Sequence, residues 1–318
     1  MFAGSGGREV MRLEERPDPQ PASREVLVEA AYAAVNPADL AQRAGNYPAP
    51  PGAPADVPGL EVAGTVIACG ESVRQWEPGD RVFGLVGGGG LADRVAVDER
   101  HVAGVPSRLD AEQAAAVPEA FITAHDAVVT QAGLCLGDVL LVNGANGGVG
   151  TAAVQIGLLA GARVLANARS DEARNRLAEL GAEPVSPDDF VERARDAGGA
   201  DVVLELVGAP NIAPGLEALA PKGRIVVVGT GAGVDCPLSL RILMARRARL
   251  LGTVLRARPA EEKAAAVQAF AHEVVPFLAD GRARPMVDRV FPVEQAADAF
   301  DYLEEPGKFG KILLGFAS

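Results

Sequence analysis

The segment from Asp138 to Gly161 constrains the fold of this chain more than any other. It reads Asp-Val-Leu-Leu-Val-Asn-Gly-Ala-Asn-Gly-Gly-Val-Gly-Thr-Ala-Ala-Val-Gln-Ile-Gly-Leu-Leu-Ala-Gly. The apolar run from Val139 to Val142 is typical of a strand that is covered on both faces. The glycines after it allow a tight turn and a close approach of the backbone to a ligand. A helix is predicted from about Gly148, and because its first N–H groups have no partner within the helix, the segment predicts a binding site for a pyrophosphate.

The strand and helix patterns around the glycines support the prediction of a dinucleotide-binding site. Gly144, Gly147 and Gly150 are spaced as G-x-x-G-x-x-G, a variant of the dinucleotide fingerprint that also occurs by chance. Here a second apolar strand, 163–168, follows the predicted helix, as in dinucleotide-binding folds. A plain turn that binds nothing is the alternative. We expect the pyrophosphate to be held by backbone amides of Gly147, Gly148, Val149 and Gly150.

The end of the second strand selects between NAD and NADP. An acidic residue there would hydrogen-bond the ribose 2′-hydroxyl of NAD, whereas cationic and hydroxyl groups would accommodate the 2′-phosphate of NADP. This chain has Arg169 and Ser170 at that end, and Arg174 one helical turn later. The sequence therefore predicts NADP (NADPH) as the cofactor. The alternative for both arginines is a solvated helix face, because Asp171 and Glu172 lie beside them.

Strand and helix patterns alternate through the middle of the chain, whereas short β-like runs between Pro and Gly clusters fill the first hundred residues. The alternation predicts a parallel sheet wound on both faces. We therefore predict the α/β class, with a doubly wound parallel-sheet (Rossmann) cofactor domain over 120–258 and a β-rich domain formed by 1–119 and 259–318. A single long helix over 260–279 and a last strand over 311–315 are also expected.

Composition excludes several classes of function. The chain has 318 residues, with 30 Lys and Arg against 42 Asp and Glu, which gives a net charge of −12. Such a surface repels nucleic acid and anionic membranes. The sequence shows neither a membrane-spanning apolar run nor a signal peptide, so a cytoplasmic protein is expected. The three His and three Cys have no ligand spacing, and no metal site is predicted.

Several segments together resemble the zinc-independent quinone oxidoreductase branch of the medium-chain dehydrogenase/reductase superfamily. The resemblance covers nearly the whole chain and implies a GroES-like fold for the β-rich domain. Two segments narrow it to the subgroup similar to the tumour-suppressor-inducible quinone oxidoreductase of animals. The segments that carry the resemblance are the glycine turn, 34–48, 58–66, 77–82 and 307–314, and those that narrow it are 118–124 and 255–258.

The resemblance also predicts the absence of zinc chemistry. In the zinc-dependent alcohol dehydrogenases of the superfamily a Cys stands in place of Asn36, and a Gly-His-Glu stands in place of Gly59, Leu60 and Glu61. Two ligands are therefore missing, and no Lewis acid would polarise the substrate. What remains is direct hydride transfer from NADPH to a quinone or to an α,β-unsaturated carbonyl compound.

The resemblance further implies roles for individual residues. Asn36 and Thr123 are expected beside the nicotinamide, and Tyr47 is expected to line the acceptor pocket, where it is a candidate general acid alongside solvent. For Asn36 the alternative is an Asn-Pro turn former, and for Lys311, which is a further candidate for the cofactor, a surface lysine. The nicotinamide half of the cofactor is expected to pass Gly229, Thr253, Val254 and Leu255.

Two other functions remain open. An enoyl reductase that acts on a thioester or biosynthetic intermediate would need a wider cationic mouth, which Arg256 and Arg258 could provide. A cofactor-binding protein with a regulatory role is the second alternative. For assembly, the resemblance implies a homodimer, and the apolar strands 224–228 and 250–255 are expected at one side of the parallel sheet, where an uncovered edge favours pairing.

Overall fold

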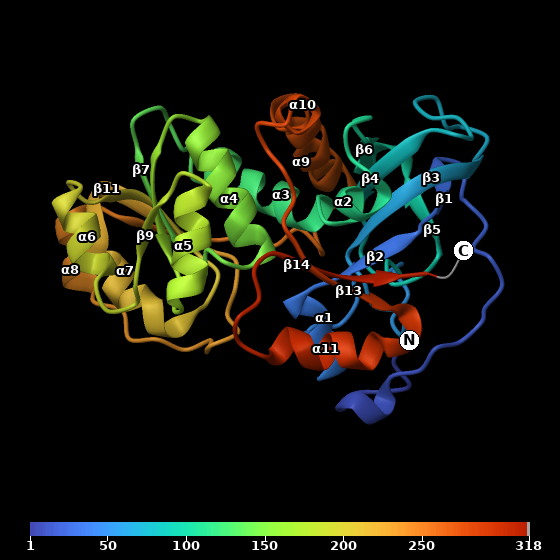
Figure 1. Ribbon diagram of the computed structural model, residues 1–318, viewed down its shortest axis with the longest axis horizontal. Helices are drawn as coiled ribbons and strands as arrows, with labels where there is room; N and C mark the ends of the chain where they lie inside the picture. Colours follow the sequence, from blue (N-terminus) through green and yellow to red (C-terminus); the bar gives the residue numbers. More distant parts are fainter. Residues whose placement is uncertain (317–318) are drawn as a thin grey trace. The chain divides into compact units, whose positions relative to one another are not determined.

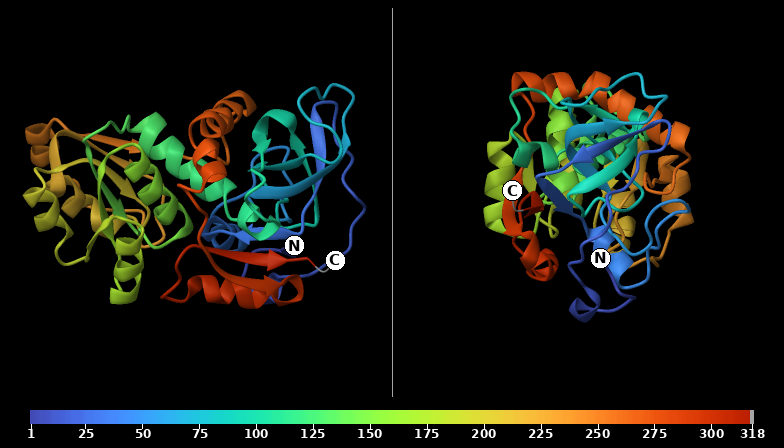
Figure 2. Two further views of the ribbon diagram at one scale, coloured as in Figure 1. Left: turned by 45° about the horizontal axis from the view of Figure 1, so that its top comes forward. Right: turned by 90° about the vertical axis from the view of Figure 1, so that its right-hand side faces the viewer.

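The computed structural model describes residues 1–316, which fall into two units. The first unit comprises Met1–Ile122 and the chain from Leu255 onward, and the second comprises Thr123–Val254. In Figures 1 and 2 the second unit carries the green-to-orange part of the chain, and the first carries the blue-to-teal and red parts. The first unit is therefore discontinuous in sequence.

The second unit is built on a six-stranded parallel sheet with the order β12-β11-β10-β7-β8-β9. Its strands are β7 (Val139–Asn143), β8 (Arg163–Asn167), β9 (Glu183–Val185), β10 (Ala200–Glu205), β11 (Leu219–Val227) and β12 (Arg249–Gly252). Its helices are α4 (Gly148–Leu159), α5 (Asp171–Glu179), α6 (Phe190–Asp196), α7 (Ile212–Ala218) and α8 (Leu240–Arg246). The helix α3 (Pro118–His125) enters this unit and continues into a π-helical turn, Asp126–Gln131.

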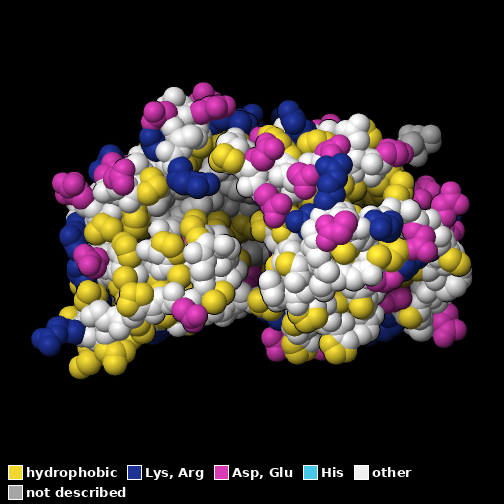
Figure 3. Space-filling model, turned by 90° about the horizontal axis from the view of Figure 1, so that it is seen from below, with side chains coloured by type: hydrophobic (Ala, Val, Ile, Leu, Met, Phe, Trp, Pro, Cys, Tyr) yellow, Lys and Arg dark blue, Asp and Glu magenta, His cyan; other side chains and the backbone are white. Residues whose placement is uncertain are grey.

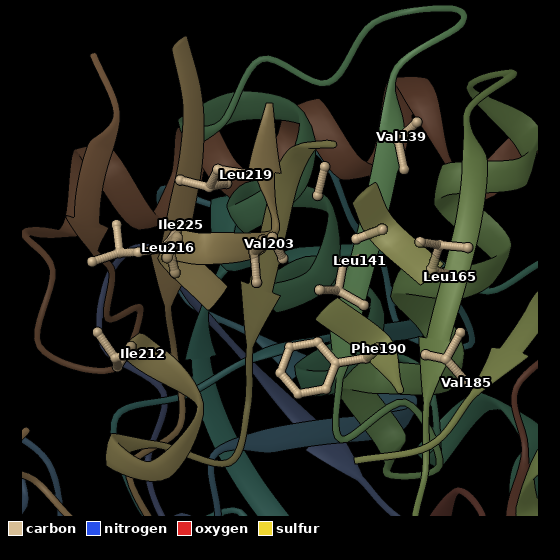
Figure 4. Close-up of a cluster of buried hydrophobic side chains, with 13 residues drawn as sticks. Val139, Leu141, Leu165, Val185, Phe190, Val203, Ile212, Leu216, Leu219 and Ile225 are labelled. Carbon is tan, nitrogen blue, oxygen red and sulfur yellow. The ribbon is translucent and has the colours of Figure 1, made fainter. Parts of the chain in front are cut away.

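Helices cover both faces of this parallel sheet. On one face, Phe190 of α6 packs with Leu141 and Leu165 in a buried hydrophobic cluster (Figure 4). Side chains alternate between the faces of a strand, so Leu140 points to the opposite face. There α4 lies so close that a Cβ on Gly157 would be 2.6 Å from the Leu140 Cδ2 atom. The sheet is doubly wound, and this part of the fold prediction is confirmed.

The first unit contains two smaller sheets. One is five-stranded and antiparallel, with the order β5-β1-β3-β4-β6. In the other, β14 lies between β13, which is parallel to it, and β2, which is antiparallel. The strands are β1 (Glu25–Glu29), β2 (Tyr32–Val35), β3 (Glu61–Cys69), β4 (Arg81–Leu85), β5 (Arg94–Asp98), β6 (Val102–Gly104), β13 (Val287–Pro292) and β14 (Lys311–Gly315). The α-helices are α1 (Pro37–Arg43), α2 (Ala111–Ala115), α9 (Ala260–Glu273), α10 (Val275–Asp280) and α11 (Ala296–Glu304).

The long helix expected over 260–279 is two helices. α9 ends at Glu273, and α10 begins at Val275 with Pro276 in its first turn. Proline has no N–H to donate and its ring displaces the preceding turn, so a continuous helix breaks at this point. The prediction of one helix was wrong because it gave the apolar periodicity more weight than the proline.

Candidate functional site

The glycine turn forms a cradle with a free helix N-terminus. Gly147 is the N-cap of α4, and the first N–H that bonds within the helix is that of Thr151, to the Gly147 carbonyl oxygen. The N–H groups of the three residues between them have no acceptor within the helix. A Cβ on Gly150 would lie 2.4 Å from the Gly144 carbonyl oxygen, so only glycine allows this close packing. The geometry of the turn is compatible with a dinucleotide pyrophosphate, and binding there stays a prediction.

A buried network of polar side chains joins the carboxyl ends of three neighbouring strands, β8, β7 and β10. Asn167 Nδ2 donates to Asn143 Oδ1 over 2.9 Å, and Asn143 Nδ2 donates to Glu205 Oε2 over 2.7 Å. Glu205 Oε1 accepts the N–H groups of Val207 and Gly208 over 2.7 and 2.8 Å. Burial raises the pKa of Glu205, although these hydrogen bonds oppose the shift. The network ties the glycine turn, which starts directly after Asn143, to the loop after β10.

The side chains expected at the 2′-phosphate differ in how many hydrogen bonds they make within the protein. Ser170 is the N-cap of α5, and its hydroxyl oxygen accepts the Ala173 N–H over 3.2 Å. Arg174 is folded over the same loop, since its Nη1 donates to the carbonyl oxygens of Ala168 and Arg169, each over 2.8 Å. Arg169 is exposed, and its side chain has no hydrogen-bond partner within residues 1–316. Arg169 is therefore the stronger candidate for a phosphate. Arg174 also pairs with Asp171, the neighbour on which the alternative of a solvated helix face rests.

Three of the other expected residues of this unit, Gly229, Thr253 and Val254, follow the carboxyl ends of β11 and β12. Gly229 lies against the loop after β10, where a Cβ would be 2.2 Å from the Leu206 carbonyl oxygen. β12 ends at Gly252, so Thr253 and the half-exposed Val254 follow the strand instead of forming its end. Thr253 Oγ1 donates to Asp126 Oδ2 over 3.2 Å. Thr123 is buried on α3, whereas Leu255 belongs to the first unit.

In the first unit, Asn36 and Lys311 meet in a buried charged cluster. The Lys311 cluster comprises Asn36, Asp39, Glu61 and Lys311, which come from the β2–α1 junction, α1, β3 and β14. Lys311 Nζ lies 2.7 Å from Glu61 Oε1 and also donates to Asn36 Oδ1. Asn36 Nδ2 donates to the same Glu61 oxygen over 2.8 Å. The Lys311 side chain is only 5% exposed, so the alternative of a surface lysine is wrong.

Asp39 and Glu61 are held by backbone groups as well. Asp39 accepts the N–H groups of Asn36 and Gly59 over 2.8 and 2.9 Å. Burial raises the pKa of Asp39 to about 6, against these two hydrogen bonds and the positive charge of Lys311. Glu61 Oε2 accepts the N–H of Glu119, at the start of α3, over 2.8 Å. One carboxylate therefore connects the C-terminal strand to other segments of the unit.

Tyr47 is fixed by a buried arginine. The Arg256 guanidinium lies over the Tyr47 ring, 4.9 Å from its centroid, and Nη1 donates to the Tyr47 carbonyl oxygen over 2.9 Å. Its other nitrogens donate to the Gly87 carbonyl oxygen and to Gln42 Oε1 over 2.8 and 2.5 Å. The Tyr47 hydroxyl has no partner within residues 1–316, and burial raises its pKa, so it remains protonated. Arg256 is 5% exposed, and each of its three guanidinium nitrogens donates to a protein acceptor, so it does not form a cationic mouth.

A zinc ion does not fit the residues of the Lys311 cluster. Asn36 and Leu60 stand where a Cys and a His would be needed, and the ammonium of Lys311 lies against the carboxylate of Glu61. A metal cation at this point would compete with a buried ammonium for the same oxygen atoms. Among the described residues, no three His, Cys, Asp or Glu side chains are placed to hold a metal ion.

The sequence analysis named Asn36, Tyr47 and Lys311 as candidates but did not name most of the residues that contact them in the structure. Asp39 could have been recognised from the sequence, because an Asn followed three residues later by Asp is a capping pattern at a helix start. Glu205 could also have been recognised, because it is an acidic residue at the end of an apolar strand. The stacking of Arg256 on Tyr47 joins residues that are far apart in sequence, and no local pattern marks it.

Comparisons with known proteins agree with this architecture. The family model described as "Alcohol dehydrogenase GroES-like domain" matches residues 22–107, and the model described as "Zinc-binding dehydrogenase" matches residues 148–272. The quinone oxidoreductase of Sus scrofa is 34% identical over 97% of this chain and 94% of its own length. None of the described helices is long and apolar enough to cross a membrane.

Solved structures show the same fold. The quinone oxidoreductase from Thermus thermophilus, which was also solved in complex with NADPH, is 35% identical with a TM-score of 0.82, over 96% of this chain and 95% of that one. CurK enoyl reductase is 25% identical with a TM-score of 0.86, over 99% and 98% of the two chains. The family implies a nicotinamide cofactor and a small-molecule substrate. The chain is an oxidoreductase that belongs to the quinone oxidoreductase branch of the medium-chain dehydrogenase/reductase superfamily.

Proposed function

We propose that this chain is a reductase that uses NADPH to transfer a hydride to a quinone or an α,β-unsaturated carbonyl compound, without zinc. The observation that carries the proposal is the buried contact of Lys311 with Asn36 and Glu61. A metal-dependent mechanism needs an open coordination site, and here an ammonium occupies the carboxylate and the amide oxygen. An acceptor that needs no Lewis acid is the consistent substrate.

The cofactor is assigned to the residues that the sequence analysis named for it. The N–H groups of Gly148, Val149 and Gly150 would bind the pyrophosphate, with Gly147 allowing its approach. Arg169 would bind the 2′-phosphate, supported by Ser170 and Arg174, which shape the loop. Asn36, Thr123, Gly229, Thr253, Val254 and Leu255 are assigned to the nicotinamide half. When bound, NADPH supplies the hydride, and the protein supplies orientation and exclusion of water.

Tyr47 is assigned to the acceptor. Its ring is held against the Arg256 guanidinium, and its hydroxyl is protonated and without a protein partner among the described residues. Such a group can stack on a quinone and donate a hydrogen bond to its oxygen. The proton that completes the reduction would come from this hydroxyl or from solvent, and comparing Tyr47→Phe with Tyr47→Ala separates the hydroxyl from the ring.

A second candidate function is reduction of an enoyl thioester, which the likeness to CurK enoyl reductase favours. Arg256 gives it no support, because its guanidinium already binds three protein acceptors. A regulatory cofactor-binding role remains as the non-enzymatic alternative. Steady-state oxidation of NADPH with quinones, enones and enoyl thioesters, before and after prolonged chelation, tests all of these. Turnover with none of the acceptors, or a stoichiometric metal whose removal abolishes turnover, would contradict the proposal.

We further propose that two copies pair through β12. This strand is the edge of the parallel sheet, and its unpaired N–H and C=O groups invite another strand. Leu250 on β12 is 40% exposed, and Leu240 and Met244 on α8 are 64% and 75% exposed. Apolar side chains beside an open strand edge are typical of an interface. A symmetric homodimer would cover both the edge and these side chains.

A further inference from the structure

The proposed chemistry leaves the charges of the Lys311 cluster unexplained. A lysine and a glutamate are buried together, with side chains 5% and 2% exposed. Burying an ion pair costs desolvation energy, and an apolar pair of the same volume is often as stable. Stability alone therefore does not explain this ion pair. The pair is explained if it controls the orientation of a neighbouring side chain.

The neighbouring group is the side-chain amide of Asn36. An ammonium can only donate hydrogen bonds, and a carboxylate can only accept them. Lys311 therefore requires the amide oxygen on its side, and Glu61 requires the amide nitrogen on its side, as the contacts show. An asparagine among neutral groups can often exchange its two ends, because oxygen and NH₂ are similar in size. Here the charges of Lys311 and Glu61 allow only one orientation of the Asn36 amide.

In this fixed orientation, the Asn36 amide can still form hydrogen bonds beyond those to Lys311 and Glu61. The Asn36 Oδ1 atom has two lone pairs, and Lys311 occupies one of them. The second N–H of Nδ2 has only a long contact, 3.5 Å, to the Ala34 carbonyl oxygen. The amide can therefore still accept one hydrogen bond from a ligand while both charged partners remain in place.

We propose that Lys311 is a positioning residue: its ammonium, together with the Glu61 carboxylate, fixes the Asn36 amide so that Oδ1 accepts a hydrogen bond from the carboxamide of a bound nicotinamide. This inference rests on the proposed function. Lys311 then acts through Asn36 and does not bind the phosphates of the cofactor. It supplies the fixed positive charge at the place where metal-dependent relatives would need a metal ion.

The orientation of the carboxamide matters because it fixes the nicotinamide ring. Hydride transfer requires the reacting atoms to lie about 3–3.5 Å apart, and small rotations of the ring change that distance. Loss of the fixed amide should therefore lower the rate of hydride transfer. The adenine half of the cofactor, which Asn36 would not touch, should bind as before.

The test is the double variant Lys311→Met with Glu61→Gln, which removes both charges together. Lys311→Met alone would leave a buried carboxylate without its cation and destabilise the protein. In the double variant, the amide that replaces the Glu61 carboxylate can keep its oxygen for the Glu119 N–H, so that its NH₂ group faces Asn36. Asn36 must then turn its own oxygen toward that NH₂ group. The double variant is expected to fold with the Asn36 amide reversed.

Two further variants complete the design. Arg43→Met is the matched control, because Arg43 is a buried cation of the same unit, 7% exposed, that pairs with Glu304 away from the cluster. Lys311→Gln combined with Glu61→Gln is the milder variant in case the first double variant does not fold. It also removes both charges, and the glutamine at position 311 can face Asn36 with either end of its amide, so no charge fixes the orientation of Asn36.

Three quantities are measured on each variant: the dissociation constants of NADPH and of 2′,5′-ADP, and the single-turnover rate of hydride transfer to a quinone. We expect 2′,5′-ADP binding within about twofold of the wild type, and NADPH binding and the hydride rate each reduced about tenfold, as for one lost hydrogen bond. Arg43→Met should lower only the melting temperature.

Each other result overturns this proposal, the proposed function, or both. A hydride rate equal to that of Arg43→Met would make the cluster structural only. A loss of 2′,5′-ADP affinity would mean that Lys311 contacts the phosphates directly. A wild type that binds NADPH but reduces no quinone or enone would refute the proposed function, whereas the comparison of NADPH with 2′,5′-ADP would still decide the role of Lys311. A wild type that binds no NADPH would refute both.

Discussion

Gly150→Ala tests whether the glycine turn is the pyrophosphate site. The added Cβ would lie 2.4 Å from the Gly144 carbonyl oxygen and 2.6 Å from the Ala145 carbonyl carbon, and both of these atoms belong to the backbone. Normal contact requires about 3.4 Å, so α4 and the turn must separate by about 1 Å. Overpacking of this kind costs about 1–3 kcal/mol, and alanine recovers up to about 1 kcal/mol of helix propensity. The melting temperature should therefore fall by only a few degrees.

The loss of cofactor affinity should be larger than the loss of stability. Moving the helix N-terminus by about 1 Å stretches hydrogen bonds of about 2.9 Å beyond their useful range. Two lost charge-assisted bonds of about 1.5–3 kcal/mol each would weaken NADPH binding more than about 100-fold. Fluorescence titration with NADPH measures this directly.

Gly157→Ala is the matched control on the same helix. Its Cβ would meet the Leu140 Cδ2 and Val164 Cγ2 atoms at 2.6 and 2.9 Å, which are ends of side chains and away from the turn. It should cost comparable stability and leave the Kd of NADPH within about threefold of the wild type. If folded Gly150→Ala binds NADPH as tightly as Gly157→Ala does, the turn is not the pyrophosphate site.

Four further predictions follow from single side chains. Arg169→Ala should weaken NADPH by about 1.5–3 kcal/mol and NADH by much less, and equal losses in titrations would argue against a 2′-phosphate contact. Tyr47→Ala should lower quinone turnover while the Kd of NADPH stays within about threefold, and unchanged turnover would remove Tyr47 from the acceptor site. Leu250→Glu at the β12 edge should convert a dimer into monomers in light scattering, and an unaltered mass would place the interface elsewhere. The folded pKa of Asp39, about 6, exceeds its unfolded value of 3.8, so its protonated form contributes stability below pH 4 that is lost as the pH rises through 6. Between pH 4 and 7.5, the change in the free energy of unfolding, measured with urea, should differ between the wild type and Asp39→Asn by up to about 3 kcal/mol. Parallel curves of this free energy against pH would contradict the raised pKa of Asp39.

The sequence predicted the second unit better than the first for a physical reason. Strands buried on both faces are short, continuous apolar runs, so β7 and β8 were recognisable from their own residues. β2 and β6 were not expected, because Tyr32–Val35 and Val102–Gly104 are too short to show an alternation. β2 exists because it pairs with β14, whose sequence lies near the other end of the chain.

The site shows the same division between local and long-range information. The glycine turn is a local pattern, and its conformation follows from its own residues and the helix that it starts. The Lys311 cluster joins residues separated by 275 and 250 positions, so no local pattern could show that this lysine is buried. The resemblance named Asn36 and Lys311 one at a time, and only the structure shows that they are bonded to each other.

The net charge of −12 is compatible with the binding of a polyanionic cofactor, because only charges close to the bound anion act on it strongly. At physiological ionic strength, screening limits the reach of exposed charges to about 8 Å. Acidic and basic side chains are interspersed on the face shown in Figure 3, so no single acidic field dominates it. An anion at the glycine turn would experience mainly the helix N-terminus and the cation of Arg169. If the cofactor is NADPH, as proposed, its affinity depends on these few groups, and single substitutions there should have large and separable effects.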